Sequence, residues 1–126
     1  MNLILSIAAG GAVGAVMRHL TILFSHNILG ADFPYGTLAV NIIGSFLMGV
    51  AVTFFPITES ASPELKAFLI VGVLGGFTTF SAFSFNILNL WNDEKMVQAM
   101  MYGASSVLFS ILAIFIGVMI ARNFMA

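Results

Sequence analysis

Residues 72–85 read Gly-Val-Leu-Gly-Gly-Phe-Thr-Thr-Phe-Ser-Ala-Phe-Ser-Phe, and the rest of the chain is organised around them. Apolar runs on both sides, 65–71 and 87–91, make this region long enough to cross a bilayer. Its middle is unsuited to a plain lipid-facing helix. The Gly75-Gly76 pair gives up about 1 kcal/mol of helix propensity per glycine relative to alanine. Two hydroxyl residues follow after Phe77, and their side chains can hydrogen-bond to the backbone groups that a break in the helix leaves unpaired.

Two interpretations of this stretch compete. Non-helical backbone at membrane depth survives only where protein or a water-filled cavity covers it, so a broken spanning helix with polar filling is a candidate ion or substrate site. Alternatively, the small residues make a face where two membrane helices pack closely. The phenylalanines interleaved with the polar residues favour the site.

The composition indicates an integral membrane protein. The chain has 126 residues, of which 60% are hydrophobic and 7% charged, and its mean hydropathy is +1.10. A spanning helix takes about 20 residues, so we predict a single all-α domain, residues 1–126, with spans at about 3–24, 36–55, 65–91 and 96–122. Loops are predicted at 25–35 and 57–64, with Pro56 ending the second helix and Ser62-Pro63-Glu64 starting the third. The hydrophobic run near the N-terminus continues past Ala8-Ala9-Gly10 and is expected to be a retained helix rather than a signal peptide. A net charge of −1 and the absence of cysteine predict no nucleic-acid partner and no thiolate metal site.

The other three spans carry a few informative residues. Gly10, Gly11 and Gly14 predict a packing face on the first helix. Arg18 is expected near the far end of that helix, where it either snorkels to the headgroups or has a structural role. Asn41 in the second helix needs a partner, as interhelical glue or as a donor that lines a pore. On the fourth helix a single stripe of hydroxyls predicts a polar track, formed by Tyr102, Ser106 and Ser110.

The positive charges show no bias between the two membrane faces. Four spans place Lys66 and Arg122 on one face, and Arg18 and Lys95 on the other. Because lysine and arginine normally collect on the cytoplasmic side, this balance is compatible with insertion in both orientations. It therefore predicts an antiparallel, dual-topology homodimer. Four helices are also too few to enclose a transport path on their own, which again favours a dimer.

The five carboxylates fall in expected loops or at helix ends: Asp32, Glu59, Glu64, Asp93 and Glu94. Proton-coupled transporters rely on an intramembrane carboxylate or histidine, and no paired carboxylates, Ser–His pair or His–Glu cluster is visible. We therefore predict that the protein is not an enzyme. What remains is a passive path of hydroxyls, an amide and aromatic edges. Such groups suit a small anion, because hydroxyl and amide protons donate and ring edges are positive.

The sequence resembles the small fluoride channels of the Fluc (CrcB) family. Gly-Gly-Phe-Thr-Thr-Phe-Ser-Ala-Phe at 75–83 is similar to the signature of that family's third helix, Gly-Thr-Leu-Ala-Val-Asn at 36–41 to its second, and Gly-Gly-Ala-Val-Gly-Ala-Val-Met-Arg at 10–18 to its first. The match extends over all four helices, and the fourth matches least closely. The resemblance implies a fluoride-selective channel of the bacterial inner membrane, in lipid, that exports fluoride passively through two pores per antiparallel dimer.

The resemblance also implies roles for residues of the second and third helices. Phe80 and Phe83 match pore phenylalanines whose ring edges meet the anion, and Asn41 matches the pore asparagine. The backbone carbonyls of Gly75 and Thr78 correspond to ligands of a central Na⁺ that is structural and not transported. Other hydroxyls of the motif are expected to line the fluoride path, namely Thr79, Ser81 and Ser84.

On the remaining helices, Arg18 matches an arginine whose role, structural or gating, stays open. Tyr102, Ser106 and Ser110 resemble the helix-four track, but Ile114 stands where some members carry threonine, which leaves the far end of the track in doubt. Two alternatives remain. One is a small multidrug-resistance-type proton-coupled exporter. Proteins of that class exchange substrate for protons through a glutamate in their first helix, and the first helix here has no acidic residue. The other is an assembly subunit that transports nothing.

Overall fold

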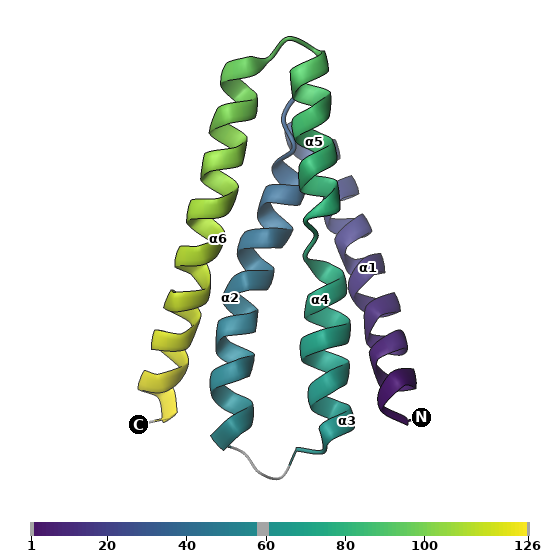
Figure 1. Cartoon of the computed structure of the whole chain (residues 1–126), viewed down its shortest axis with the longest axis vertical. Coiled ribbons are helices and arrows are strands. Elements are labelled where there is room, and N and C mark those ends of the chain that lie inside the picture. The colour runs from purple at the N-terminus through teal and green to yellow at the C-terminus, as the bar shows by residue number, and fades with distance from the viewer. Residues whose placement is uncertain (1, 58–60, 126) are drawn as a thin grey trace.

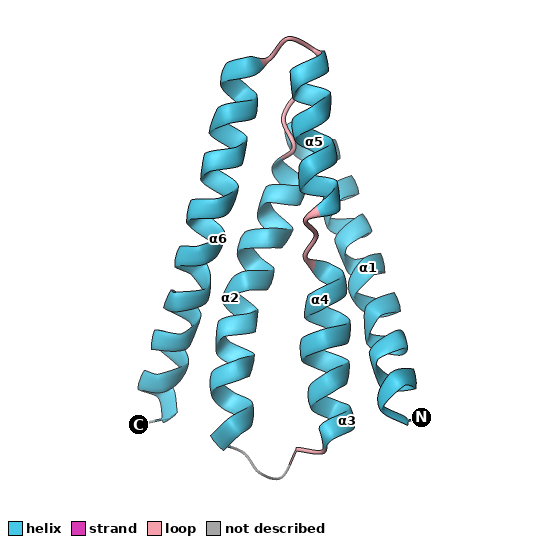
Figure 2. Ribbon diagram, in the orientation of Figure 1, coloured by secondary structure: helices cyan, strands magenta, loops and turns pink. Residues whose placement is uncertain are grey.

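The structure of the chain is a computed structural model that describes residues 2–57 and 61–125 (Figure 1). The regular secondary structure in these residues is entirely helical (Figure 2). The elements in chain order are α1 (Asn2–Leu29), α2 (Tyr35–Ile57), α3 (Pro63–Lys66), η1 (Ala67–Leu74), α4 (Gly75–Phe77), α5 (Ser81–Asn92) and α6 (Met96–Met125).

Four segments are long and apolar enough to cross a membrane: Asn2–Leu29, Tyr35–Phe55, Pro63–Asn92 and Met96–Phe124. The protein is therefore an integral membrane protein with four spans. The two chain ends lie at one end of the bundle, while the α1–α2 connection and the α5–α6 turn lie at the other (Figure 1). The bundle is narrow at the turn and wide at the chain ends. Many exposed side chains of α6, such as Phe115 and Phe124, are large and apolar, as a lipid-facing surface requires.

The first helix ends later than predicted, at Leu29 rather than Phe24. Gly30, at φ 83°, is the residue that stops it, and its amide donates to the carbonyl of His26 at 3.0 Å. Glycine adopts this left-handed conformation at no steric cost, which makes it the usual residue just after a helix. The polar residues from Ser25 onward therefore continue the helix, and the predicted loop 25–35 shortens to 30–34.

The boundary between the second and third spans was predicted with mixed success. Pro56 does not end α2, which extends to Ile57, and residues 58–60 of the predicted loop 57–64 lie outside the described part of the chain. The predicted start of the third span is confirmed: the Ser62 hydroxyl accepts a hydrogen bond from the Leu65 amide at 3.1 Å, with Pro63 at the first helical position. Both are standard features of a helix N-terminus.

The third span is not a uniform α-helix. Residues Ala67–Leu74 form a wide π-helix, a rare conformation that the sequence did not lead us to expect. One short α-helical turn follows, and Thr78 then adopts an extended backbone at φ −83°, ψ 155°. The helix resumes at Ser81. The helix is therefore interrupted over residues 78–80, one residue after the glycine pair (Figure 2).

Glycine contacts hold the helices in two tightly packed pairs. The α1 helix packs along η1 and α4, and α2 packs along α6. A Cβ on Gly14 would overlap the Val73 carbonyl oxygen, and one on Gly10 would overlap that of Phe68. Gly49 and Gly117 bring α2 and α6 equally close. The predicted packing face on α1 is confirmed for Gly10 and Gly14, whereas Gly11 has open space where a Cβ would be.

Candidate functional site

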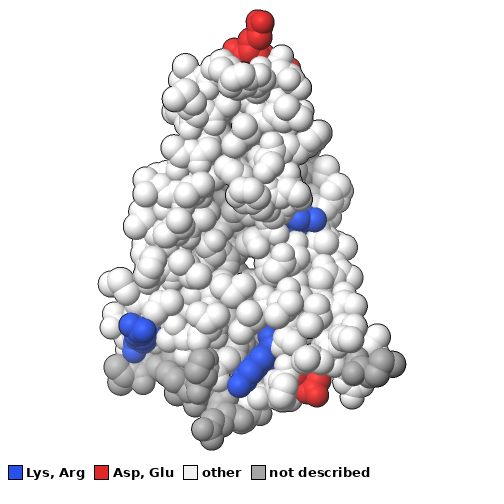
Figure 3. All heavy atoms as spheres, in the orientation of Figure 1, with Lys and Arg blue, Asp and Glu red and all other residues white. Residues whose placement is uncertain are grey.

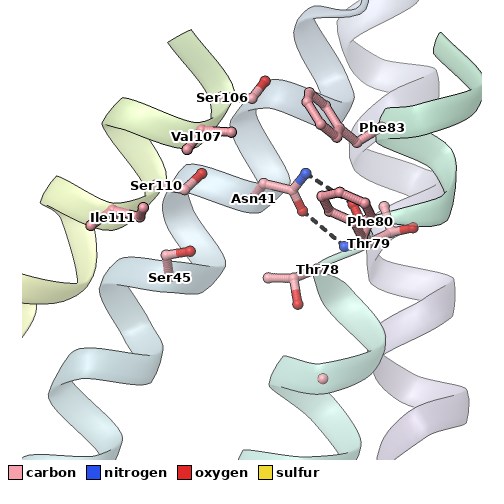
Figure 4. A pocket seen from close by; sticks show the side chains of 11 residues that line it. Asn41, Ser45, Thr78, Thr79, Phe80, Phe83, Ser106, Val107, Ser110 and Ile111 are labelled. Carbon is pink, nitrogen blue, oxygen red and sulfur yellow. Dashed lines mark hydrogen bonds between the residues drawn. The ribbon is translucent and has the colours of Figure 1, made fainter. Parts of the chain in front are cut away.

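A pocket of ≈ 450 Å³ lies between α2, α6 and the interrupted part of the third span (Figure 4). The sequence had singled out most of its polar lining. The lining residues are Asn41, Ser45, Gly75, Thr78, Thr79, Phe80, Phe83, Ser106, Val107, Ser110 and Ile111. No ionisable side chain is among them. The pocket can therefore meet a solute only with hydroxyls, one carboxamide, backbone groups and aromatic rings.

Asn41 joins α2 to the interruption in the third span. Its Nδ2 donates to the Thr79 carbonyl at 3.0 Å, and its Oδ1 accepts from the Thr79 amide at 2.8 Å (Figure 4). One side chain thus satisfies both backbone groups of a non-helical residue, which would be costly to leave unpaired. The sequence predicted either an interhelical contact or a pore-lining donor for Asn41. In the structure one hydrogen of Nδ2 makes the interhelical contact, and the second hydrogen remains free to donate.

Side-chain oxygens replace two bonds of the helical ladder. The Thr79 amide donates to Asn41, so it is not available to the carbonyl of Gly75 four residues earlier. The Ala82 amide donates to the Thr79 hydroxyl at 3.1 Å, so it is not available to the carbonyl of Thr78. Two carbonyl oxygens thereby lose their ladder donors within one turn, and both residues line the pocket. Carbonyl oxygens freed in this way suit a hard cation.

Hydroxyl groups on α6 face the pocket without a partner. The Oγ atoms of Ser106 and Ser110 are buried and have no hydrogen-bond partner among the described residues. An unpaired buried hydroxyl costs about 1–3 kcal/mol, so such a pair calls for an explanation. Both point between α6 and the third span in Figure 4, where they can bond a solute that enters the pocket.

The aromatic residues contribute two rings of unequal burial. The centroids of Phe80 and Phe83 are 5.4 Å apart, and the rings are tilted by 53°. Phe83 is buried, whereas Phe80 is 75% exposed. Phe83 also packs on Tyr102, at 5.2 Å between centroids. The pocket therefore has one buried aromatic wall, Phe83, and one aromatic wall on the surface of the chain, Phe80.

A polar cluster that the sequence analysis missed lies beyond Phe83. Tyr102 is fully buried, and its hydroxyl accepts from Asn86 Nδ2 at 3.1 Å. The same nitrogen donates to the hydroxyl of Thr37 at 2.8 Å. Asn86 and Thr37 had a signal in the sequence, since each lies at helical spacing from a predicted residue. Tyr102 belongs to this cluster and does not line the pocket itself.

Three other predicted residues do not line the pocket. Ser81 and Ser84 are exposed on α5, although the Ser81 hydroxyl lies 3.3 Å from that of Thr79. Arg18 is well inside α1, eleven residues before its last residue, or about 17 Å at 1.5 Å per residue. The expectation of a place near the helix end was wrong because Gly30, not Phe24, ends the helix. Arg18 has no ion pair among the described residues.

The acidic side chains lie at the ends of the spans, away from the pocket. In Figure 3 most of the visible face carries no charge, and the acidic atoms lie at its two ends. Asp93 and Glu94 form the turn between α5 and α6, Asp32 lies in the α1–α2 connection and Glu64 is in α3. Glu59 lies outside the described residues. The described carboxylates thus sit at the ends of the spans, as the sequence predicted.

Comparison with known proteins gives consistent results. The model of one protein family, described as "CrcB-like protein, Camphor Resistance (CrcB)", matches residues 5–118. A "Fluoride-specific ion channel FluC" from Chelativorans sp. (strain BNC1) is 48% identical over 117 residues, which cover 93% of this chain and 94% of the relative. Proteins with the same name from Rhizobium meliloti and Caulobacter vibrioides (strain NA1000 / CB15N) are 46% identical over 122 residues and 43% over 127. The first of these alignments covers 97% of this chain and 98% of the relative, and the second covers 100% of both.

Proposed function

The chain belongs to the CrcB-like family, and on that premise we propose that it is a fluoride-selective channel. The relatives that match along nearly their whole length are named fluoride-specific ion channels. The observation that carries the proposal is the pocket, which combines two unpaired serine hydroxyls with the Asn41 amide and has no ionisable lining residue. Neutral donors lower the cost of dehydrating an anion without holding it as tightly as a cationic side chain.

The fluoride path runs along the pocket between the aromatic rings and the α6 hydroxyls. Ring edges carry the positive part of the aromatic quadrupole. Phe80 and Phe83 both line the pocket and meet the anion with a ring edge. The free hydrogen of Asn41 Nδ2 and the hydroxyls of Ser106 and Ser110 then supply hydrogen bonds. The remaining family residues, Ser81, Ser84 and Tyr102, lie at the margins of this path.

The protein exports fluoride from the cytoplasm passively, as an integral protein of the inner membrane. Hydrogen fluoride enters a cell from weakly acidic surroundings and ionises inside, so an open anion path is sufficient for export. No carboxylate or histidine lines the pocket to couple the flow to protons. This chemistry also argues against the multidrug-resistance-type exporter, because α1 carries no acidic residue.

A structural Na⁺ is held at the interruption of the third span. The proposal is supported by the two carbonyl oxygens, those of Gly75 and Thr78, whose ladder donors are engaged by side chains. Oxygen ligands suit Na⁺, and carbonyls from two chains can complete its coordination. When bound, the ion neutralises partial negative charge at the interruption. The chain's own contribution is to hold the two carbonyls in place through Asn41 and Thr79.

The functional unit is a homodimer with antiparallel subunits and two pores. One chain leaves Phe80, Ser81 and Ser84 exposed on the third span. Hydroxyls and an interrupted backbone are unsuited to lipid, so this face requires a protein cover. A second copy supplies that cover, and it also closes the pocket on the open side of Phe80.

The test is fluoride efflux from liposomes that contain the purified protein, with valinomycin to carry the balancing potassium and chloride as the control anion. We expect rapid fluoride release with little chloride release and no requirement for a proton gradient. Proton-dependent movement of organic cations without fluoride release would favour the exporter. The absence of any flux would favour an assembly subunit.

A further inference from the structure

The contacts between α2 and α6 set these helices in a defined register. Both run from the turn end of the bundle towards the chain ends (Figure 1). A Cβ on Gly49 would overlap the carbonyl oxygen of Ile114, and one on Gly117 would overlap that of Phe46. The helices are parallel (Figure 1), and the two contacts together place Gly49 level with Gly117. Because residues four apart lie on one face of a helix, one above the other, this register extends to the preceding turns.

Ser45, one turn before Gly49, lies about one turn beyond Ser110 towards the chain ends, and both serines line the pocket. One further turn back, Asn41 lies beside Ser110 in Figure 4, and Asn41 also lines the pocket. Nearer the turn end, Asn86 joins Thr37 to Tyr102. The polar track on α6 thus has a matching stripe on α2, and the α2 stripe extends about one turn further towards the chain ends.

Ser45 behaves as the α6 serines do, not as the hydroxyl residues that serve their own helix. Thr53, two turns further along α2, donates to the Gly49 carbonyl at 2.8 Å, and Thr21 and Thr78 bond the carbonyl four residues back in the same way. No hydrogen bond within the described residues engages the Ser45 hydroxyl. In Figure 4 the Ser45 side chain lies one turn from Asn41 and faces the pocket.

The same contacts decide what Ile114 does. The α2 and α6 backbones touch at Gly49 and Ile114, so no path runs between the two helices at that level. Ile114 does not line the pocket, whose α6 wall ends at Ser110 and Ile111. A hydroxyl at position 114 is therefore not needed to complete the track, because the last hydroxyl comes from the other helix.

We propose that Ser45 is an anion-binding residue and that its hydroxyl, with that of Ser110, forms the terminal fluoride position of the path. The inference rests on the proposed function and adds a residue to it. Two hydroxyl donors that converge from facing helices replace part of the hydration shell of a small anion at the end of the pocket. The last hydroxyl donor of the path thus comes from α2 and not from position 114 on α6.

The test compares Ser45→Ala with Ser105→Ala in the fluoride efflux assay. Ser105 is the matched control, since it lies beside the α6 stripe and does not line the pocket. Because Ser45→Ala removes a hydrogen bond to a charged solute, we expect it to slow fluoride release by about tenfold and Ser105→Ala to leave the release unchanged. The double variant with Ser110→Ala should fall short of the product of the two single effects, because both hydroxyls serve one anion.

Two outcomes would overturn the inference while the channel itself stands: wild-type flux in Ser45→Ala, or recovery of the lost flux when Ile114→Thr is added to it. Fluoride-dependent thermal stabilisation of the purified protein is a second readout that does not require conduction. A stabilisation that Ser45→Ala abolishes, in a protein that passes no fluoride, would support the binding position without the channel. A wild-type protein that neither passes fluoride nor is stabilised by it would overturn both proposals.

Discussion

At the scale of single residues, Asn41 and Thr79 make the interruption of the third span possible. Breaking a helix inside a membrane frees backbone groups that lipid cannot satisfy. The carboxamide of Asn41 pairs with both backbone groups of Thr79, and the Thr79 hydroxyl accepts from the Ala82 amide. Each of these bonds also frees the carbonyl of a residue that lines the pocket, Gly75 or Thr78. The residues that stabilise the break are thus the ones that create its chemistry.

Replacing Asn41 with aspartate should weaken its contact with the Thr79 backbone and also impair the passage of fluoride. The carboxylate keeps an acceptor for the Thr79 amide, but it places negative charge against the Thr79 carbonyl and in the anion path. From the value of a hydrogen bond to a charged group, we expect fluoride flux to fall by at least about tenfold. Liposome efflux measures the change, and Asn89→Asp, on the exposed face of α5, is the control. Equal flux in the two variants would remove Asn41 from the path.

At the scale of elements, glycines determine which helices pack together and in which register. Gly10 and Gly14 bring α1 against η1 and α4, while Gly49 and Gly117 join α2 to α6. Close backbone approach of this kind is the main source of stability between membrane helices, since lipid removes the hydrophobic drive for association. The π-helix of η1 lies along the first of these contacts. The pocket lies between the two pairs, so its width depends on both.

Gly14→Ala should separate α1 from the third span. Its Cβ would overlap the Val73 carbonyl oxygen and approach the Phe77 amide within 2.9 Å, and overpacking of this kind costs about 1–3 kcal/mol. Gly11→Ala is the matched control, because nothing lies within 4 Å of its Cβ. It should leave stability unchanged or raise it by up to about 1 kcal/mol through helix propensity. Thermal unfolding in detergent compares them, and equal midpoints would contradict the packing of α1.

At the scale of the whole molecule, the distribution of charge bears on orientation. Arg18 lies well inside α1, so it no longer counts for either membrane face. Lys66 and Arg122 then stand at the end with the termini, and Lys95 stands at the other. The balance of two against two becomes two against one, and the support for dual topology now comes mainly from the exposed polar face of the third span.

Dual topology can be measured directly because the chain has no native cysteine. Asp93→Cys and Asn123→Cys place single thiols at opposite ends of the bundle. In intact cells a membrane-impermeant maleimide should label about half of each variant if both orientations insert equally. Full labelling of one variant and none of the other would establish a single orientation and exclude the antiparallel dimer.

Removal of Na⁺ should weaken the assembled protein. An ion bound only by the folded dimer stabilises it by mass action, so replacing Na⁺ with N-methylglucamine should lower the thermal midpoint and the fraction of dimer in detergent. Potassium, which is larger, should substitute poorly. Identical midpoints and dimer fractions in the three cations would argue against the roles given to the Gly75 and Thr78 carbonyls.

Local patterns in the sequence were sufficient for much of this description. Apolar runs of span length predicted four membrane helices, the Ser62-Pro63 pair predicted the start of the third, and the spacing of Tyr102, Ser106 and Ser110 predicted one polar face. These features depend on residues within a few turns of one another. What the tertiary structure decided is which groups meet: the Asn41 amide with the Thr79 backbone, Asn86 with Thr37 and Tyr102, and Ser45 with Ser110 in the lining of one pocket. Such pairs depend on the register between helices, which is set by glycine contacts between segments far apart in the chain and therefore leaves no local signal in the sequence.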